Sequence, residues 1–396
     1  MSFPASPQPP ALPHMDVPMP RAQDAQERPS PCFSATDHAM MARALLLAER
    51  GAYTTKPNPM VGCVIAHGND VVGEGFHQRA GDPHAEVLAL REAGERARGA
   101  TAYVTLEPCA HTGRTPPCAK NLVEAGVARV VAASRDPFEH VDGKGFEVLR
   151  AAGIMVEVGL MEAQARTLNR GFFSRIERGR PWVRVKLAMS LDGHTALASG
   201  ESHWISSEAS RADVQRWRAR CGALLTASGT VLADDPMLTV RMDDDAACVA
   251  PLRVVLDPGL AIPEDSRVLD DSAPTLLLHA PDSRVAGYLR QRDRAMIPSN
   301  AGMLDLDAAL RLLATRGINE VQTEAGATLC GALLQAGLVD ELLLYVVPVL
   351  LGARGKPLFA GWDAPTMADR YDLRLIETRQ VGNDMRLLLY PSCSPD

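Results

Sequence analysis

The sequence predicts an α/β protein with two folded domains behind a proline-rich extension. From Thr36, segments with the two-residue period of strands alternate with segments of helical spacing, and the alternation resumes after Pro181. Residues 1–35 instead contain nine prolines and show no hydrophobic period. The expected organisation is a disordered extension at 1–35, a first domain at 36–160, a helical connector at 161–180, a second domain at 181–391 and a tail at 392–396.

The first domain is predicted to be a three-layer α/β/α sandwich around a mixed or mostly parallel sheet. Asp37 is expected to cap a first helix that ends at Gly51. Asp82 and Pro83 have the residue types of a cap and a first helical position, so that His84 would open a second helix. The other predicted elements are strands at 61–66, 71–75, 102–106, 129–133 and 155–158, and helices at 118–125 and from the turn at 143–145 to 152.

The second domain is also predicted to be α/β, although its pattern is less explicit. Small residues at 324–331 follow a predicted strand and open a helix. Backbone N–H groups at a helix start suit a phosphate. The spacing is not G-x-G-x-x-G, however, and close packing of a helix on a sheet explains the glycines equally well. The other predicted elements are strands at 182–188, 223–227, 252–256, 275–278, 320–323, 342–347, 371–377 and 384–390, a turn at 190–193 and a helix at 207–220.

Composition and charge exclude several classes of protein. The 396 residues carry a formal net charge of −7, and only 5% are aromatic, which argues against a nucleic-acid surface of basic grooves and stacking platforms. No apolar run approaches the roughly 18 residues of a membrane span, and the extension lacks the pattern of a signal peptide. The scattered cysteines form no disulfide framework. We expect a cytoplasmic homo-oligomer whose partner is a small molecule, with neither nucleic acid nor membrane as a partner.

His84, Glu86, Cys109 and Cys118 indicate the chemistry of the first domain. One histidine and two cysteines supply three of the four ligands of zinc, and catalytic zinc sites keep the fourth position open. At roughly 100° per helical residue, Glu86 lies about 200° round from His84, which suits a base for the bound water better than a fourth ligand. This set is typical of zinc-dependent nucleobase deaminases. The predicted helix start at Cys118 favours its thiolate.

Three alternatives stay open from the residues alone. Cys109 and Cys118 could be ordinary buried thiols, because eight residues separate them instead of the two in Pro-Cys-x-x-Cys. The chain could be a nucleic-acid base deaminase with an accessory domain, which would present a basic face. It could also be a structural zinc module joined to a nucleotide-binding regulatory domain. That arrangement needs a fourth protein ligand, for which His111 is the only near candidate.

Motifs in both halves resemble those of the bifunctional deaminase–reductase family of riboflavin biosynthesis. They are the segments 56–62, 81–86 and 105–118 in the first half, and 190–193, 198–202, 230–236 and 324–326 in the second. The resemblance implies a cytidine-deaminase-like first domain and a dihydrofolate-reductase-like second domain. It implies zinc-dependent hydrolytic deamination of 2,5-diamino-6-ribosylamino-4(3H)-pyrimidinone 5′-phosphate. NADPH-dependent reduction of the ribosyl side chain would follow and give 5-amino-6-(5-phosphoribitylamino)uracil.

The resemblance also implies roles for individual residues. His84, Cys109 and Cys118 match the ligands of one zinc ion per chain, and Glu86 matches the proton-transferring residue. Positions that match the deaminase substrate site are Asn58, His77, His111 and Arg114. Positions that match contacts to the NADPH cofactor are Ala188, Trp204, Thr230, Asp234, Gly326, Ala327, Thr328, Leu329, Cys330, Gly331 and Ala332. Positions that match the reductase substrate site are Ser202, Arg218, Leu238, Arg241 and Glu324.

Overall fold

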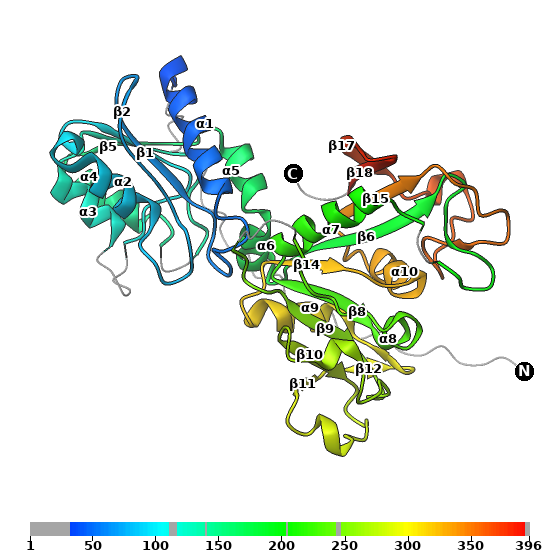
Figure 1. Cartoon of the computed structure of the whole chain (residues 1–396). Helices are drawn as coiled ribbons and strands as arrows, with labels where there is room; N and C mark the ends of the chain where they lie inside the picture. Colours follow the sequence, from blue (N-terminus) through cyan, green and yellow to red (C-terminus); the bar gives the residue numbers. More distant parts are fainter. Residues whose placement is uncertain (1–31, 111–116, 139–140, 203–204, 243–246, 393–396) are drawn as a thin grey trace, which may run out of the picture. The chain divides into compact units, whose positions relative to one another are not determined.

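The computed structural model describes residues 32–110, 117–138, 141–202, 205–242 and 247–392 (Figure 1). The first described helix, α1 (Ala35–Glu49), has Ser34 as its N-cap. The Ser34 hydroxyl accepts the N–H of Asp37 at 3.1 Å, and the Asp37 carboxylate accepts the N–H of Ser34 at 2.9 Å. Asp37 is therefore the third residue of a capping box and not the cap itself. The predicted extension up to residue 31 lies outside the described residues, as does Asp243-Asp244-Asp245, an acidic stretch whose sequence predicts a solvated loop.

A five-stranded mixed sheet forms the centre of the first half. In spatial order its strands are β2 (Asp70–Phe76), β1 (Gly62–His67), β3 (Thr101–Val104), β4 (Arg129–Ala132) and β5 (Met155–Val158). The helices that cover one face are α2 (Ala85–Ala93), α3 (Cys118–Ala125) and α4 (Lys144–Ala151). The other face packs on α1 and on α5 (Glu162–Leu168). β1 is antiparallel to both neighbours, while β3, β4 and β5 run parallel. The predicted three-layer sandwich is confirmed.

Glycines in the sheet bring α2 close to β2. A Cβ atom at Gly75 would lie 2.3 Å from the carbonyl oxygen of Ala85, the first residue of α2. Only a residue without a side chain fits there, so the first turn of α2 rests directly on the strand. His84, which precedes that turn, is the N-cap of α2 in an extended conformation (φ −71°, ψ 164°). The predicted cap at Asp82 was wrong by two residues.

A nine-stranded sheet forms the centre of the second half. In spatial order its strands are β11 (Asp293–Met296), β10 (Thr275–His279), β9 (Leu252–Leu256), β8 (Ala223–Ala227), β14 (Glu320–Thr323), β6 (Trp182–Ser190), β15 (Glu341–Val347), β18 (Asp384–Pro391) and β17 (Leu373–Val381). The strands from β11 to β15 run parallel, and β18 and β17 are antiparallel. Two short ladders accompany it, β7 (His194–Ala196) with β16 (Lys356–Pro357) and β12 (Ser299–Asn300) with β13 (Met303–Leu304).

Helices cover both faces of this second sheet. They are α7 (Glu208–Arg220), α8 (Ser228–Asp234), α9 (Leu306–Thr315) and α10 (Ala327–Gln335). α9 and α10 share one buried apolar cluster with the central strands, whereas α7 and α8 contribute to clusters against other strand residues. The connector predicted as a single helical stretch is two helices, α5 and α6 (Arg170–Arg178), with Asn169 between them. α8, α9 and the short ladders were not predicted.

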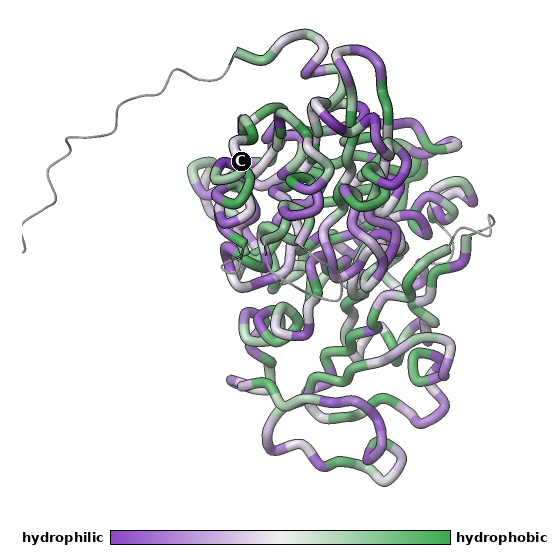
Figure 2. The backbone as a smooth tube through the Cα atoms, turned by 90° about the vertical axis from the view of Figure 1, so that its left-hand side faces the viewer, coloured by the Kyte–Doolittle hydropathy of each residue, from purple (hydrophilic) through white to green (hydrophobic). Residues whose placement is uncertain are grey.

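No helix in the described part of the chain combines the length and the apolar character that crossing a bilayer requires. Figure 2 shows the hydropathy of each residue along the backbone, where hydrophobic stretches are short and alternate with hydrophilic ones. Many of the apolar residues are instead packed into the buried clusters of the two sheets.

Candidate active sites

Three metal-ligating side chains converge at the ends of elements around the first sheet. His84 caps α2, Cys109 follows β3, and Cys118 is the first residue of α3. His84 Nδ1 lies 3.3 Å from Cys118 Sγ and 3.6 Å from Cys109 Sγ, and the three ligand atoms all lie within 4.8 Å of one another. A tetrahedral zinc ion, about 2.3 Å from sulfur and about 2.0 Å from nitrogen, separates such atoms by roughly 3.5 Å. The three donors therefore fit zinc as they stand.

The pKa values of the two neighbouring thiols shift in opposite directions. The hydrogen bond from Cys118, with His84 helping and burial opposing, lowers the pKa of Cys109 to about 4, and the same bond raises the pKa of Cys118. The backbone N–H of Cys118, at the start of α3, donates to the Cys109 sulfur at 3.4 Å. The start of α3 thus also favours the thiolate of Cys109, in addition to that of Cys118, its first residue. A divalent cation would displace the remaining proton and take both thiolates.

Glu86 lies next to these ligands as a buried carboxyl group. It is only 3% exposed, and among the described residues its Oε2 atom has no hydrogen-bond partner. Burial, followed by the charge of the Cys109 thiolate, raises the pKa of Glu86 to about 7. A carboxyl group with a pKa near neutrality can both accept a proton and return it. A buried polar atom without a partner costs stability, so this atom suits a bound water or substrate.

Glu107 holds the segment that carries Cys109, a role that the sequence analysis did not assign. The buried Glu107 carboxylate accepts the backbone N–H groups of Gly143 and Gly145, each at 3.0 Å, at the start of α4. A Cβ atom at Gly145 would lie 1.9 Å from the carbonyl oxygen of Pro108. α4 therefore packs directly against the main chain of Pro108, the residue before the metal ligand Cys109. The sequence shows a carboxylate between a strand and Pro-Cys, but no pattern in it identifies the main-chain groups that this carboxylate binds.

Two residues predicted for the deaminase substrate site lie together beside the ligands. Asn58 Nδ2 lies 3.0 Å from His77 Nε2, and His77 Nδ1 lies 3.4 Å from the carbonyl oxygen of Pro83. Burial lowers the pKa of His77, so the neutral ring donates through Nδ1 and accepts from the Asn58 amide. The His77 ring meets the His84 ring edge-on, with 5.4 Å between centroids. The other two predicted positions, His111 and Arg114, lie outside the described residues.

The residues predicted to contact NADPH lie at the carboxyl edge of the second sheet. β6, β14 and β8 are parallel neighbours, so their carboxyl ends share one edge. Ala188 lies near that end of β6, and Thr230 and Asp234 lie in α8, which follows β8. The segment from Gly326 to Ala332 forms the start of α10, which follows β14. This is the edge at which α/β sheets bind their ligands. Trp204 lies outside the described residues.

The donors at this edge fit a phosphate-bearing cofactor. Gly326 caps α10 without a side-chain hydrogen bond, which leaves the N–H groups of the first helical turn for an anion. Near the ends of β8 and β14, the hydroxyl groups of Thr226 and Thr323 are buried and have no hydrogen-bond partner among the described residues. A polar ligand at the edge would suit these groups.

Most of the residues predicted for the reductase substrate site form one cluster. Arg218 donates twice to the Glu324 carboxylate, at 2.7 Å each, and once to the carbonyl oxygen of Thr239 at 2.9 Å. Arg241 donates to the Thr239 hydroxyl at 2.8 Å, and the buried Leu238 precedes Thr239. Although burial opposes it, Arg218 lowers the pKa of Glu324 to about 2, so this carboxylate stays charged. The remaining predicted residue, Ser202, lies in the loop before α7.

Comparisons with known proteins agree with both halves of the site. The model of the cytidine and deoxycytidylate deaminase zinc-binding region matches residues 34–134, and that of the RibD C-terminal domain matches residues 181–387. The riboflavin biosynthesis protein RibD of Escherichia coli (strain K12) is 49% identical over 364 residues, which cover 89% of this chain and 99% of the relative. The chain belongs to the RibD family. The RibD of Haemophilus influenzae is 46% identical over 91% of this chain and 98% of its own length.

Solved RibD structures share the fold over both halves. Acinetobacter baumannii RibD superposes with a TM-score of 0.84 at 45% identity, and covers 90% of this chain and 99% of its own. A deaminase/reductase from Thermotoga maritima gives a TM-score of 0.80 at 30% identity with the same coverage. The cytidine-deaminase-like and reductase folds are thus confirmed. The protein is a bifunctional deaminase and reductase of riboflavin biosynthesis, whose deaminase domain is of the zinc-binding kind and whose reductase domain is related to NADPH-dependent reductases.

Proposed function

We propose that the deaminase half acts on 2,5-diamino-6-ribosylamino-4(3H)-pyrimidinone 5′-phosphate and that the reductase half converts its product to 5-amino-6-(5-phosphoribitylamino)uracil. The Thermotoga maritima relative is named as a diaminohydroxyphosphoribosylaminopyrimidine deaminase and 5-amino-6-(5-phosphoribosylamino)uracil reductase, which supports this choice. The observation that carries the proposal is the convergence of His84, Cys109 and Cys118 beside the buried carboxyl of Glu86.

In the deaminase half, His84, Cys109 and Cys118 would hold zinc, which when bound activates water for attack on C2 of the pyrimidine. Glu86 takes one proton of the attacking water and delivers it to the ring nitrogen. It then takes the proton of the hydroxyl group added at C2 and delivers it to the departing amine, which leaves as ammonia as the C2 carbonyl forms. Its pKa of about 7 suits both steps. Asn58, His77, His111 and Arg114 are proposed to orient the substrate.

In the reductase half, NADPH when bound supplies a hydride to C1′ of the opened ribose. Ala188, Trp204, Thr230, Asp234 and the segment 326–332 are proposed to hold the cofactor. The residues proposed to position the substrate are Ser202, Arg218, Leu238, Arg241 and Glu324. The bidentate contact of Arg218 with Glu324 fixes both side chains before the substrate arrives, and positioning of this kind is what hydride transfer requires.

The test of the deamination step is Glu86→Gln in the full chain. Loss of a general acid–base typically costs a factor of about 10² to 10⁴, so ammonia release from the diaminopyrimidine phosphate should fall by that factor. Zinc content and reduction of the separately supplied deaminated intermediate should remain. Mass spectrometry with and without NADPH distinguishes the two products. Ammonia release at the wild-type rate would remove Glu86 from the mechanism.

We also propose a cytoplasmic location and a homo-oligomeric state. Every cysteine within the described residues is a free thiol, as is usual in a reducing compartment. The edge strand β17 exposes apolar side chains, among them Leu375 at 56% and Ile376 at 42%. Exposed apolar edges favour association with a second chain. Light scattering of the purified protein tests this, and a monomer at micromolar concentration would contradict it.

A further inference from the structure

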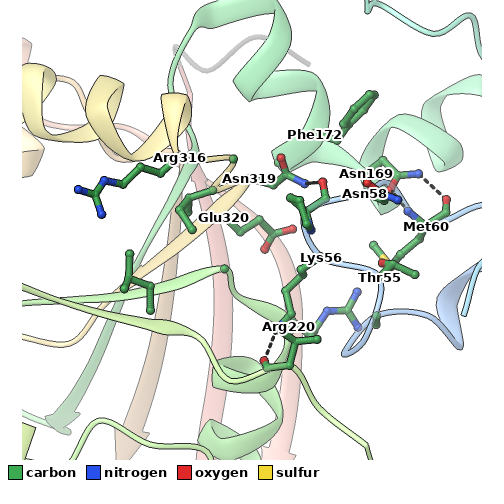
Figure 3. Close-up of a pocket in the computed structure, with 18 of the residues that line it drawn as sticks. Thr55, Lys56, Asn58, Met60, Asn169, Phe172, Arg220, Arg316, Asn319 and Glu320 are labelled. Carbon is green, nitrogen blue, oxygen red and sulfur yellow. Dashed lines mark hydrogen bonds between the residues drawn. The ribbon is translucent and has the colours of Figure 1, made fainter. Parts of the chain in front are cut away.

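The loop that carries Asn58 is bound by the second half of the chain. This loop, residues 55–60, leads into β1, and Figure 3 shows the Lys56 side chain extending from it towards main-chain groups beyond the first half. Lys56 Nζ lies 2.5 Å from the carbonyl oxygen of Ala219, 2.9 Å from that of Cys221 and 3.1 Å from that of Val249. An ammonium group has three N–H donors. Each of them therefore has an acceptor in the reductase half.

Further polar contacts hold the same loop. The side-chain amide of Asn319, which directly precedes β14, donates to the carbonyl oxygen of Pro57 at 2.8 Å. Asn169, between α5 and α6, accepts the N–H of Met60 at 2.7 Å and donates to its carbonyl oxygen at 2.8 Å. These side chains line a cavity of about 230 Å³ beside the loop (Figure 3). Packing is incomplete there, so hydrogen bonds carry much of the positioning.

A continuous series of contacts leads from this loop to the metal ligands. Asn58, two residues after Lys56, bonds to His77 at 3.0 Å, and the His77 ring lies against the ring of His84. A shift of the loop would therefore move the Asn58 amide and loosen the support of His77. Mispositioning by about 1 Å is enough to cost two orders of magnitude in rate.

We propose that Lys56 is a positioning residue of the deaminase, through which the reductase half holds the loop of Asn58 in place for the pyrimidine substrate. This inference rests on the deaminase function proposed above. Within the described residues the hydrogen bonds of the Lys56 ammonium go to main-chain carbonyl groups, so it acts through Asn58 and not on the reacting atoms. Burial lowers the pKa of Lys56, and the three carbonyl groups compensate for the lost solvation of its charge.

The test is Lys56→Met in the zinc-loaded full chain, with both activities measured separately. We expect KM for the diaminopyrimidine phosphate to rise and kcat/KM for ammonia release to fall at least tenfold. Zinc content and the kinetics of reduction of the deaminated intermediate should stay within twofold of wild type. Lys56→Arg, which keeps a charged donor, should recover part of the loss. Asn319→Ala removes the other reductase contact to the loop and provides the same test should Lys56→Met fail to fold.

The matched control is Arg220→Met. Arg220 lines the same cavity as the loop (Figure 3), but its ion pair, at 3.5 Å, is with Glu49 in α1 and not with the loop. Its replacement should therefore leave ammonia release within twofold of wild type. Unchanged deaminase KM and kcat in Lys56→Met would overturn the inference. An equal loss of both activities, or a loss of zinc, would also overturn it, because Lys56 would then act on folding. A wild-type chain that releases no ammonia would instead refute the proposed function itself.

Discussion

The substitution Gly145→Ala tests whether the packing of α4 positions the zinc ligand Cys109. The added Cβ atom would lie 1.9 Å from the carbonyl oxygen of Pro108, whereas real Cβ contacts stay above 3.0 Å. Either α4 or Pro108 must therefore move by about 1 Å, against the hydrogen bonds from Gly143 and Gly145 to Glu107. Cys109 follows Pro108 directly, and zinc–ligand distances tolerate only about 0.2 Å.

We expect Gly145→Ala to bind less than half of the wild-type zinc and to lose at least 100-fold in deaminase kcat/KM, in line with the cost of about 1 Å of misplacement. Reduction of the deaminated intermediate should be unchanged, because the reductase half has its own sheet and core. The measurements are zinc by atomic absorption and the two activities assayed separately. Gly287→Ala, where a Cβ meets open space, is the control. Full zinc with deaminase activity within threefold of wild type would refute the reasoning.

Two partly buried ion pairs lead to further predictions. Arg129→Met removes the guanidinium 2.6 Å from Asp37, which should lower the free energy of unfolding by about 3 kcal/mol at pH 7. Although burial opposes it, the hydrogen bonds of Arg129 and Ser34 lower the pKa of Asp37 from 3.8. The difference in free energy of unfolding between wild type and Arg129→Met, measured by urea unfolding, should therefore become smaller as the pH falls below that value. A difference that becomes larger would contradict the pairing. Glu324→Gln should cost about 3 kcal/mol at pH 7. The contribution of the charged Glu324 to the free energy of unfolding is complete above pH 4.5 and is lost towards pH 2. If Glu324→Gln melts at the wild-type temperature at pH 7, the ion pair does not stabilise the fold as predicted.

The zinc site could be predicted from the sequence because each ligand lies at the end of an element with a recognisable pattern. Cys118 follows two prolines and begins α3 where it was expected. The start of α2 was wrong because His84 takes the capping position without a side-chain cap bond. Its ring points to the thiols instead. A rule based on the residue types that cap helices therefore assigned the cap to Asp82.

The contacts of Lys56 and Glu107 could not be predicted in the same way. Both bind main-chain groups, which have no residue-type signal. Lys56 reaches acceptors 163 to 193 positions further along the chain, and Glu107 reaches donors 36 and 38 positions away. Only the folded arrangement shows these pairs. α9 is different, since Asp305 caps it and its leucines follow a helical spacing, and that pattern was present in the sequence.

The acceptors of Lys56 have a consequence for how this protein tolerates mutation. They are peptide oxygens of residues 219, 221 and 249, and every amino acid carries such an atom. Replacing those three side chains one by one would leave the contact intact, while a single codon change at Lys56 removes it. For this contact the sensitivity to mutation is therefore one-sided: side-chain replacements at residues 219, 221 and 249 would overlook a dependence that the replacement of Lys56 reveals.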